Sequence, residues 1–260
     1  MSSSAPALTP KRYVALGDSQ TEGLHDYHPD GSPRGWADRF AEHLSDASPD
    51  LRYANLAVRG KRTREVLEDQ LEAALALSPD LATVVSGVND VVRPGADVAA
   101  VAGDLEHMYR ELTHTGCFVM GCTFPLPTVG LTRRFAPSLR ALNAAVREAA
   151  ARHGVLLVEI ENMPSAADLR LWNADRIHLN PEGHRLLGAA FAGVFDGAPD
   201  GEWTRPLPPA RSLSRLREAA AESLWIARFV IPKVIRTLRG VSSGDGRSAK
   251  RPQLTAIRHP

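Results

Sequence analysis

The chain has 260 residues, of which 43% are hydrophobic and 23% are charged, and its formal net charge is +1. This length and composition allow a sizeable apolar core, so a wholly disordered protein is excluded and one large domain with room for an appendage is favoured. No uncharged apolar run approaches the roughly 20 residues that span a bilayer. The amino terminus has no basic segment followed by an apolar core, which argues against a secretory signal. We therefore expect a cytoplasmic protein whose residues 1–11 are flexible.

The charges are unevenly distributed along the chain. Residues 211–260 contain 11 Lys and Arg against 3 Asp and Glu, whereas residues 1–210 contain 20 against 27. The chain therefore has an acidic body and a basic tail. Although the net charge is nearly zero, the tail can bind a partner of opposite charge.

Two residue types carry no evident chemistry. Cys117 and Cys122 lie five apart in one predicted strand, and an odd separation directs two strand side chains to opposite faces, which is unfavourable for a disulfide. No Cys/His spacing typical of a metal site is present, so we expect buried, inert thiols and no metal or organic cofactor. The histidines in predicted helices are expected at the surface or at helix ends; they are His107, His114, His153 and His184.

The first predicted element is a short apolar run around Tyr13–Leu16 that ends abruptly in Gly17-Asp18-Ser19. This pattern is typical of a buried strand that turns sharply at its carboxyl end and presents a hydroxyl. Ligands of open α/β sheets collect at that end of the strands, so Ser19 is well placed to be a nucleophile. A polar turn after a strand explains the same residues without any chemistry.

Strands and helices alternate through the next 180 residues. Apolar runs predict four further strands, and apolar residues spaced three or four apart predict the helices between them. Such alternation indicates a five-stranded, doubly wound parallel sheet that is covered on both faces. The predicted strands span residues 51–56, 81–86, 117–122 and 155–160, and the predicted helices lie around 36–44, 66–75, 98–112, 137–153 and 181–195.

Three more polar segments follow these strands or occupy the last loop. They are Asn55 to Gly60, Gly87-Val88-Asn89-Asp90 and Asp175-Arg176-Ile177-His178. The carboxyl ends of parallel strands share one edge of a sheet, so these segments are expected to form a single site with Ser19. Taken alone, Asn89 is explained by a loop turn and Gly60 is uninformative.

Together the four segments resemble the signature blocks of the SGNH/GDSL hydrolase family, in the family's order, over about residues 12–195. The resemblance implies a flavodoxin-like three-layer α/β/α sandwich that cleaves small-molecule esters. It implies that Ser19 is the nucleophile and that His178 is the base, oriented by Asp175. It also implies an oxyanion hole made by the Ser19 and Gly60 backbone N–H groups and the Asn89 side-chain amide.

These residue types suit acyl transfer. A serine hydroxyl needs a base to remove its proton during attack, and histidine takes and returns protons near neutrality. A carboxylate on the other ring nitrogen fixes the tautomer. Asp18 is expected to support the turn by bonding neighbouring backbone, and Asp90 and Asp168 are less favoured partners for His178. Acyl transfer, thioester or lysophospholipid cleavage, and a non-catalytic binding or scaffold role on the same fold remain alternatives.

The rest of the chain is expected to lie outside this domain. Residues 196–210 form a linker rich in proline and glycine, and residues 211–240 form a basic amphipathic helix that bends at Pro232. Its apolar stripe could pack on the hydrolase domain, lie on an anionic membrane surface, or mediate dimerisation or cover the cleft. Residues 241–260 are expected to be disordered. Nucleic acid is not an expected partner, since no recognised binding fold is present, and no oligomeric state is indicated.

Overall fold

The computed structural model describes residues 8–93, 95–128, 130–198, 200–209, 214–240 and 242–257. Of the predicted flexible terminus, residues 1–7 lie outside the described residues. The strands are β1 (Arg12–Gly17), β2 (Arg52–Asn55), β3 (Leu81–Val85), β4 (Phe118–Cys122), β5 (Leu156–Val158) and β6 (Arg251–Ala256). The helices are α1 (Ser19–Glu22), α2 (Gly35–Ala47), α3 (Thr63–Ala76), α4 (Val88–Val91), α5 (Val98–His114), α6 (Ala136–His153), α7 (Pro181–Phe195), α8 (Arg215–Trp225) and α9 (Ile231–Leu238).

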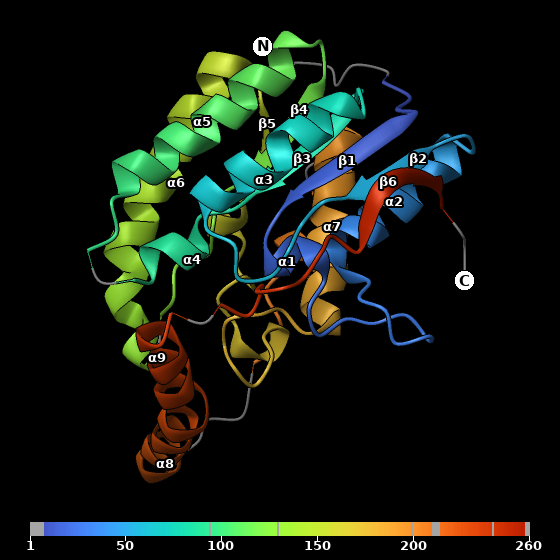
Figure 1. Cartoon of the computed structure of the whole chain (residues 1–260). Coiled ribbons are helices and arrows are strands. Elements are labelled where there is room, and N and C mark those ends of the chain that lie inside the picture. The colour runs from blue at the N-terminus through green and yellow to red at the C-terminus, as the bar shows by residue number, and fades with distance from the viewer. Residues whose placement is uncertain are drawn as a thin grey trace.

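The strands form one sheet in the order β5-β4-β3-β1-β2-β6, in which all neighbours are parallel except β2 and β6. Helices α2 and α7 pack together on one face, and α3, α5 and α6 cover the other (Figure 1). The predicted three-layer α/β/α sandwich is thus confirmed. The chain steps outward from β1 to β2 and then crosses to β3 on the other side of β1, so the strand order reverses at β1. Ligands of open α/β sheets bind at the carboxyl ends of the strands at such a point.

The sharp turn after β1 requires a glycine. Gly17 has φ +153°, and a Cβ on it would lie 2.4 Å from the carbonyl oxygen of Val85, a contact that no other residue could accept. The buried Gln70 side chain accepts a hydrogen bond from Gly17 N–H and donates one to Gly17 O, both at 2.9 Å. The strand end that leads to Ser19 is therefore fixed by both its main-chain groups.

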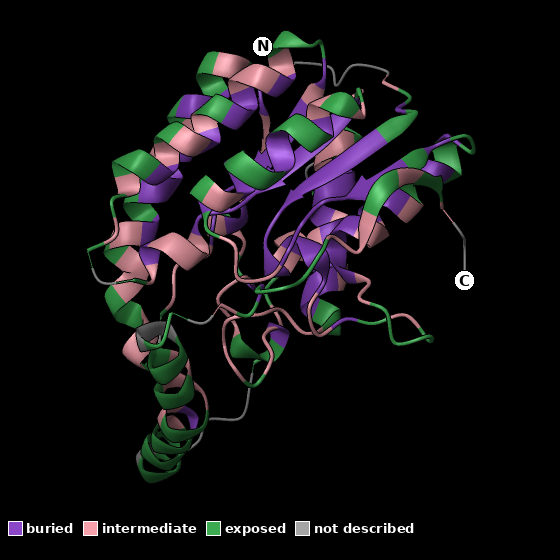
Figure 2. Ribbon diagram, viewed as in Figure 1, coloured by how far each residue is buried: buried purple, intermediate pink, exposed green. Residues whose placement is uncertain are grey.

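The core lies on both faces of the central strands, which are buried along nearly their whole length (Figure 2). The rings of Tyr13 and Tyr53 stack with centroids 5.0 Å apart, and Trp36 stacks on Phe191 at 4.2 Å, which joins α2 to α7. Each fully buried aromatic side chain of this kind stabilises the fold by about 2–3 kcal/mol. The Tyr13 hydroxyl bonds Thr83 Oγ1 at 2.9 Å, so its polar atom is satisfied as well.

The helical histidines are expected at the surface or at helix ends, and His184 stands in the first turn of α7 but not at the surface. This residue of α7 is fully buried; its Nδ1 accepts a hydrogen bond from Trp36 N–H at 3.2 Å, and its Nε2 donates to Leu24 O at 2.9 Å. Burial lowers the pKa of His184 to about 4. The ring is therefore neutral at neutral pH and ties α7 to the start of α2.

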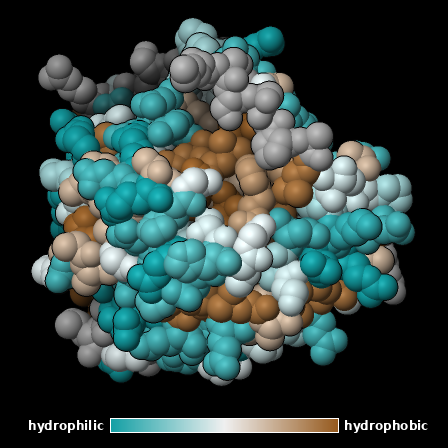
Figure 3. All heavy atoms as spheres, turned by 90° about the horizontal axis from the view of Figure 1, so that it is seen from above, coloured by the Kyte–Doolittle hydropathy of each residue, from teal (hydrophilic) through white to brown (hydrophobic). Residues whose placement is uncertain are grey.

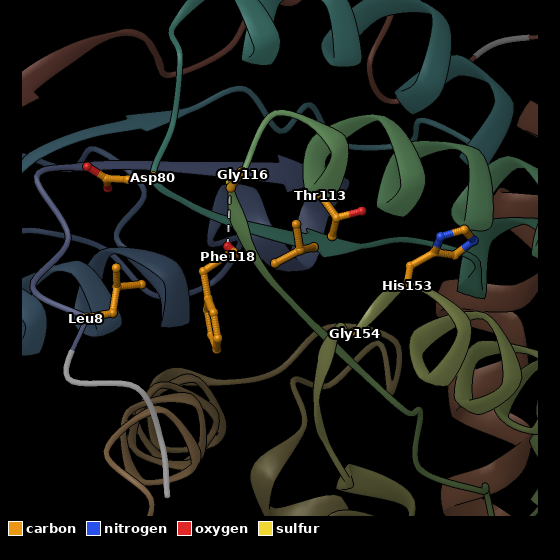
Figure 4. Close-up of a pocket in the computed structure, with 9 residues that line it drawn as sticks. Leu8, Asp80, Thr113, Gly116, Phe118, His153 and Gly154 are labelled. Carbon is orange, nitrogen blue, oxygen red and sulfur yellow. Dashed lines mark hydrogen bonds between the residues drawn. The ribbon is translucent and has the colours of Figure 1, made fainter. Parts of the chain in front are cut away.

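The edge at which the strands begin carries apolar atoms near its centre (Figure 3). A pocket of about 340 Å³ opens there, with Leu8, Thr113 and Phe118 among its lining residues (Figure 4). Cys117 also lines it, and burial raises the pKa of its thiol to about 12, so the sulfur is unreactive at neutral pH. The Asp80 carboxylate there accepts hydrogen bonds from the main chain that starts β1. The Asp80 carboxylate at this edge thus stabilises the start of β1.

The prediction that residues 241–260 are disordered is wrong for β6. This strand pairs antiparallel with β2 and adds a sixth strand to the predicted five. Just before it, the buried ammonium of Lys250 pairs with Asp38 at 2.8 Å and donates to Pro33 O and Arg34 O. An edge strand bonds to one neighbour only, so main-chain bonds and one buried ion pair hold this segment without the apolar run that sequence patterns require.

The C-terminal helix, which comprises α8, a π-helical turn at Ile226–Val230 and α9, lies beyond the carboxyl ends of the strands (Figure 1). The π turn ends at Val230, two residues before Pro232, the residue at which the sequence predicts a bend. Of the three uses considered for its apolar stripe, packing on the hydrolase domain does not account for the stripe residues that the structure describes. Leu224 and Ile231 are exposed, whereas Trp225 on the other side of the helix is buried.

Two further predictions are only partly covered. The linker segment contains a short helical turn, Glu202–Thr204, and Glu202 pairs with Arg185 of α7 at 2.7 Å. The start of the predicted basic helix, residues 211–213, lies outside the described residues. None of the helices in the described ranges is both long enough and apolar enough to cross a membrane.

Candidate active site

The carboxyl edge of the sheet brings together Ser19, His178 and Asp175. His178 Nε2 lies 2.9 Å from Ser19 Oγ, and His178 Nδ1 lies 2.6 Å from Asp175 Oδ2. Because a carboxylate only accepts hydrogen bonds, Nδ1 carries the ring proton of the neutral imidazole. Nε2 is then left as the acceptor that faces the serine hydroxyl.

Asp175 is fixed within its own loop. Its Oδ1 accepts hydrogen bonds from the backbone N–H groups of Ile177 and His178, at 2.9 and 3.0 Å. Burial alone would raise the pKa of Asp175, but the hydrogen bond and charge of His178 and the two backbone donors outweigh it and lower the pKa to about 2. The carboxylate is therefore ionised throughout the neutral range, as a group that orients a histidine must be.

The loop that carries these residues ends at a capped helix. Asn180 Oδ1 accepts a hydrogen bond from Gly183 N–H at 3.0 Å, and Pro181 is the first residue of α7, as the sequence predicts. Asn180 Nδ2 also donates to Arg170 O at 2.7 Å. The cap therefore holds both ends of the loop on which His178 stands.

Asp18 caps the short helix α1 that begins at Ser19. Its Oδ1 accepts a hydrogen bond from Gln20 N–H at 3.1 Å, and its Oδ2 accepts one from Asn89 Nδ2 at 3.2 Å. Burial raises the pKa of Asp18 to about 6. Asp18 thus bonds neighbouring backbone and also reaches the asparagine of the third polar segment.

The three expected oxyanion donors lie at the same edge. Gly60 has φ +79°, and a Cβ on it would lie 2.6 Å from Ser243 Oγ of the C-terminal tail. Among the described residues, no protein acceptor takes a hydrogen bond from the N–H of Ser19 or of Gly60. Asn89 Nδ2 donates to Lys61 O at 3.0 Å in addition to Asp18.

The turn that leads to Gly60 is held by an ion pair. Arg59 N–H donates to Glu22 Oε2 at 2.7 Å, and the Arg59 guanidinium pairs with the same carboxylate. The sequence pattern assigns no role to Glu22, although it stands only three residues after Ser19 on α1. Through this ion pair the nucleophile helix and the Gly60 turn are bonded directly to each other.

The two less favoured acids are bonded to residues other than the histidine. Asp90 Oδ2 accepts hydrogen bonds from the backbone N–H and the hydroxyl of Thr63, at 3.0 and 2.9 Å. Asp168 pairs with Arg170 at 2.7 Å. Both carboxylates are occupied by structural partners, in agreement with the lower weight given to them.

Sequence reasoning missed Gln20. Its Nε2 donates to Ile177 O at 2.8 Å, and its Oε1 accepts a hydrogen bond from Leu179 N–H at 3.3 Å. These two bonds bracket His178 and join its loop to the helix that carries Ser19. A glutamine next to a serine has no signature in sequence, since its role depends on a loop about 157 residues away.

Sequence reasoning also missed His25. Its Nε2 is 3.6 Å from Asp175 Oδ2, and its ring centroid is 5.4 Å from that of His178. Burial lowers the pKa of His25, which favours the neutral ring near neutrality. Among the described residues, His25, Asp175 and His178 form a group whose ligand atoms lie within 4.8 Å of one another and could hold a metal ion. Both ring nitrogens of His178 already have partners, so a metal there would compete with the bond to Ser19.

The C-terminal helix contacts the same loop from outside. Trp225 Nε1 donates to Asp175 O at 3.0 Å, and the Arg176 guanidinium lies 4.7 Å from the centroid of the Trp225 ring. Arg176 has φ +56° and pairs with Glu222, whose Oε1 also accepts a hydrogen bond from Leu131 N–H at 2.9 Å. One face of this helix thus fixes the backbone beside Asp175.

Comparison with known proteins agrees with this fold. An α/β hydrolase enzyme, LAE5, from the metagenome of Lake Arreo, Spain, is 20% identical with a TM-score of 0.62, and the match covers 74% of this chain and 97% of that one. The lipase/acylhydrolase from Enterococcus faecalis is 22% identical with a TM-score of 0.60, covering 72% and 96%. A catalytic mutant of Axe2, an acetylxylan esterase from Geobacillus stearothermophilus, is 17% identical with a TM-score of 0.61, covering 80% and 100%.

No curated protein matches the chain in sequence. The family model of the GDSL-like lipase/acylhydrolase family, however, matches residues 15–186, which is about two thirds of the chain and includes all four polar segments of the carboxyl edge. The chain therefore belongs to the GDSL-like lipase/acylhydrolase family and is a carboxylic ester hydrolase.

Proposed function

We propose that this protein hydrolyses small-molecule carboxylic esters through an acyl-enzyme on Ser19, with His178 as general base and acid and Asp175 as its orienting carboxylate. The observation that carries the proposal is the unbroken series of hydrogen bonds from Ser19 Oγ through the His178 ring to Asp175, at 2.9 and 2.6 Å. Both distances lie within the range required for proton transfer between a nucleophile and its base.

In the first half of the reaction, Ser19 Oγ attacks the ester carbonyl carbon while His178 Nε2 takes the hydroxyl proton. The imidazolium that forms is stabilised by the ionised Asp175 at Nδ1. Collapse of the tetrahedral intermediate breaks the bond to the alcohol oxygen, which receives the proton from Nε2. Ser19 is left as an acyl ester.

In the second half, water takes the place of the alcohol. His178 Nε2 accepts a proton from the water as its oxygen attacks the acyl carbon, and the same nitrogen returns a proton to Ser19 Oγ when the acid leaves. Each half uses the same base and passes through its own negatively charged tetrahedral intermediate. Every proton transfer runs through Nε2, so no metal or organic cofactor is needed in these steps.

The negative charge of each tetrahedral intermediate is proposed to be held by the backbone N–H groups of Ser19 and Gly60 and by Asn89 Nδ2. The two backbone donors have no protein acceptor among the described residues, which leaves them available to a substrate oxygen. Asn89 would exchange its 3.2 Å bond to Asp18 for a bond to the developing oxyanion. Donors of this kind act mainly in the transition state, where the charge appears.

The proposal is tested by hydrolysis of a p-nitrophenyl ester series, from acetate to palmitate, by the wild type and by Ser19→Ala. We expect turnover by the wild type and a loss of at least about 10³-fold in the variant, whereas Ser32→Ala, which changes an exposed serine, keeps full activity. Equal activity of the wild type and Ser19→Ala would contradict the proposal. If the wild type transfers the acyl group to an added alcohol or thiol and releases no free acid, the enzyme is an acyltransferase.

A further inference from the structure

The outer side of the C-terminal helix carries a continuous apolar stripe. Of the seven large apolar side chains that are exposed in the described residues, five stand on this helix. Single exposed apolar residues are ordinary on protein surfaces, but a contiguous row of them marks an interaction site. We name the row the outer stripe; it consists of Leu216, Leu224, Ile231, Val234 and Ile235, together with the exposed Ala220 and Ala227.

The outer stripe lies on the solvent-exposed side of the helix. Leu216 is 84% exposed and Leu224 is 66% exposed, and Figure 2 colours most of this helix as exposed. The inward side is made by Glu222, Trp225 and Phe229, which are buried or half-buried. At a rise of 1.5 Å per residue, the stripe from Leu216 to Ile235 is about 30 Å long.

A row of arginines runs beside the outer stripe. Arg217, Arg228 and Arg239 follow one another at intervals of eleven residues, which is close to three helical turns, so they share one side of the helix. All three are exposed, and within the described residues none forms an ion pair with a carboxylate. Elsewhere the arginines of this chain are commonly paired, as in Arg39 with Asp26 and Arg147 with Glu159.

We propose that the outer stripe and its arginine row bind the surface of an anionic lipid bilayer. A helix with an apolar face and a basic flank lies in the plane of a membrane, with its apolar side chains among the lipid headgroups and its cations beside the phosphates. Charge complementarity favours this occupant over a second copy of the chain. In an antiparallel pair of outer stripes, the two rows of unpaired arginines would lie on the same side, and their repulsion disfavours that pair.

Such docking would place the active site next to the bilayer. The side of the helix opposite to the outer stripe contacts the loop of Asp175 and His178 through Trp225 and Glu222. An α-helix is about 10 Å wide, so a membrane under the stripe would lie roughly one helix diameter from that loop. This part of the inference rests on the proposed function, and it names the substrate class as esters whose acyl chain is held in a lipid layer.

The test is co-sedimentation of the full chain with vesicles. We expect binding to phosphatidylcholine vesicles that contain about 30% phosphatidylglycerol, at least about tenfold weaker binding to pure phosphatidylcholine, and weakening of the first by salt. The variant Arg217→Gln/Arg228→Gln/Arg239→Gln should lose at least about tenfold in affinity. The matched control is Arg52→Gln/Arg140→Gln/Arg205→Gln. It should bind as the wild type does, because these three exposed arginines lie outside the C-terminal helix.

Further variants keep the test independent of folding and of catalysis. Leu224→Ser/Ile231→Ser/Ile235→Ser should lose vesicle binding while it keeps the thermal midpoint and the turnover of p-nitrophenyl acetate within about twofold. Ser19→Ala should bind vesicles as the wild type does. A Ser19→Ala enzyme that is fully active but bound to vesicles would overturn the proposed function and leave the docking intact.

Three results would overturn the docking proposal. They are absence of wild-type binding to the anionic vesicles, equal binding to neutral and anionic vesicles, and a dimer in light scattering that the triple serine variant converts to a monomer. Release of fatty acid from a vesicle-borne ester, reduced in parallel with binding by the arginine variant, supports the assigned substrate class. Retained binding without such release by an enzyme that is active on soluble esters overturns the substrate class alone.

Discussion

The hydrolase domain and the C-terminal segment, residues 214–257, use their charged side chains in different ways. Within the domain, the charged groups around Ser19 are buried and bonded, as Asp18 is to Asn89 and Glu22 is to Arg59. On the C-terminal helix, Glu222 pairs with Arg176 and the half-buried Lys233 interacts with Asp175, whereas the arginine row is exposed. The buried, hydrogen-bonded groups around Ser19 form a frame to which the reaction is assigned. The C-terminal helix supports this frame with one side and leaves its other side free for a partner.

If the domain alone carries the chemistry, its oxyanion donors should matter most. We predict that Asn89→Ala lowers kcat/KM by about 10²–10³-fold, because one donor to the transition-state charge is lost. The measurement is steady-state hydrolysis of the best p-nitrophenyl ester, with Asn162→Ala at an exposed position as the control. A loss below about threefold would mean that Asn89 is only a loop residue.

The burial of Asp18 should also make the free energy of unfolding depend on pH. The pKa of Asp18 rises from 3.8 to about 6 in the native state because the carboxylate is buried. The native state therefore holds this proton more tightly than the unfolded state does, so stability from this group is present at low pH and is lost as pH rises from about 4 to about 6. The free energy of unfolding of Asp18→Asn, relative to wild type, should increase by about 1–3 kcal/mol over this window.

This prediction is measured by urea unfolding of both proteins at several pH values. The change with pH is diagnostic, because the introduced amide would meet the Asn89 amide as a second donor and add a cost that does not depend on pH. A difference between the two proteins that stays constant from pH 4 to pH 7 would contradict the buried, raised carboxyl.

Within the frame, Gln20 should act by positioning. We predict that Gln20→Ala lowers kcat by about tenfold with KM within about twofold, because the loop of His178 loses both bonds to the nucleophile helix. Steady-state kinetics measure this split, and Gln20→Glu, which keeps the acceptor for Leu179 N–H, should recover part of the loss. A variant in which only KM changes would place Gln20 in substrate binding instead.

The support given by the C-terminal helix should be the smallest effect on catalysis. We predict that Trp225→Phe lowers kcat by about threefold, because the ring stays under Arg176 while the hydrogen bond to Asp175 O is lost. The matched control is Trp203→Phe, since Trp203 packs on the domain core away from the triad loop. A loss as large as that of Asn89→Ala would show that the two regions are not separate in function.

The sequence predicts most of the sheet and the place of the site. Buried parallel strands read as apolar runs, as β3 does, and polar residues such as Ser19 and Asn89 stand where those runs end. The search for apolar runs does not predict β6, because β6 is an edge strand that contains Pro252, is partly exposed along its length and is bonded to β2 alone. The roles of His184 and Gln20 are not predicted either, since the partners of this buried histidine and this bridging glutamine lie about 150 residues away in the sequence.

The outer stripe shows a related limit. The spacing of Leu216, Leu224 and Ile231 predicts an amphipathic helix correctly, yet it does not say which side of the helix meets the domain. That choice is made by Trp225 and Glu222, through a hydrogen bond and an ion pair to the triad loop. Polar contacts of this kind have no period in the sequence, so only the folded chain assigns the inward side.

The most direct test of the central claim is covalent labelling of Ser19 with a fluorophosphonate. In this reaction, Ser19 Oγ forms a bond to phosphorus and fluoride leaves, so the label remains at the nucleophile that the base activates. We predict one adduct in the intact protein, mapped by peptide mass spectrometry to Ser19, and its absence in His178→Gln. No adduct, or an adduct on another residue that survives in Ser19→Ala, would contradict the assignment of Ser19 as the nucleophile.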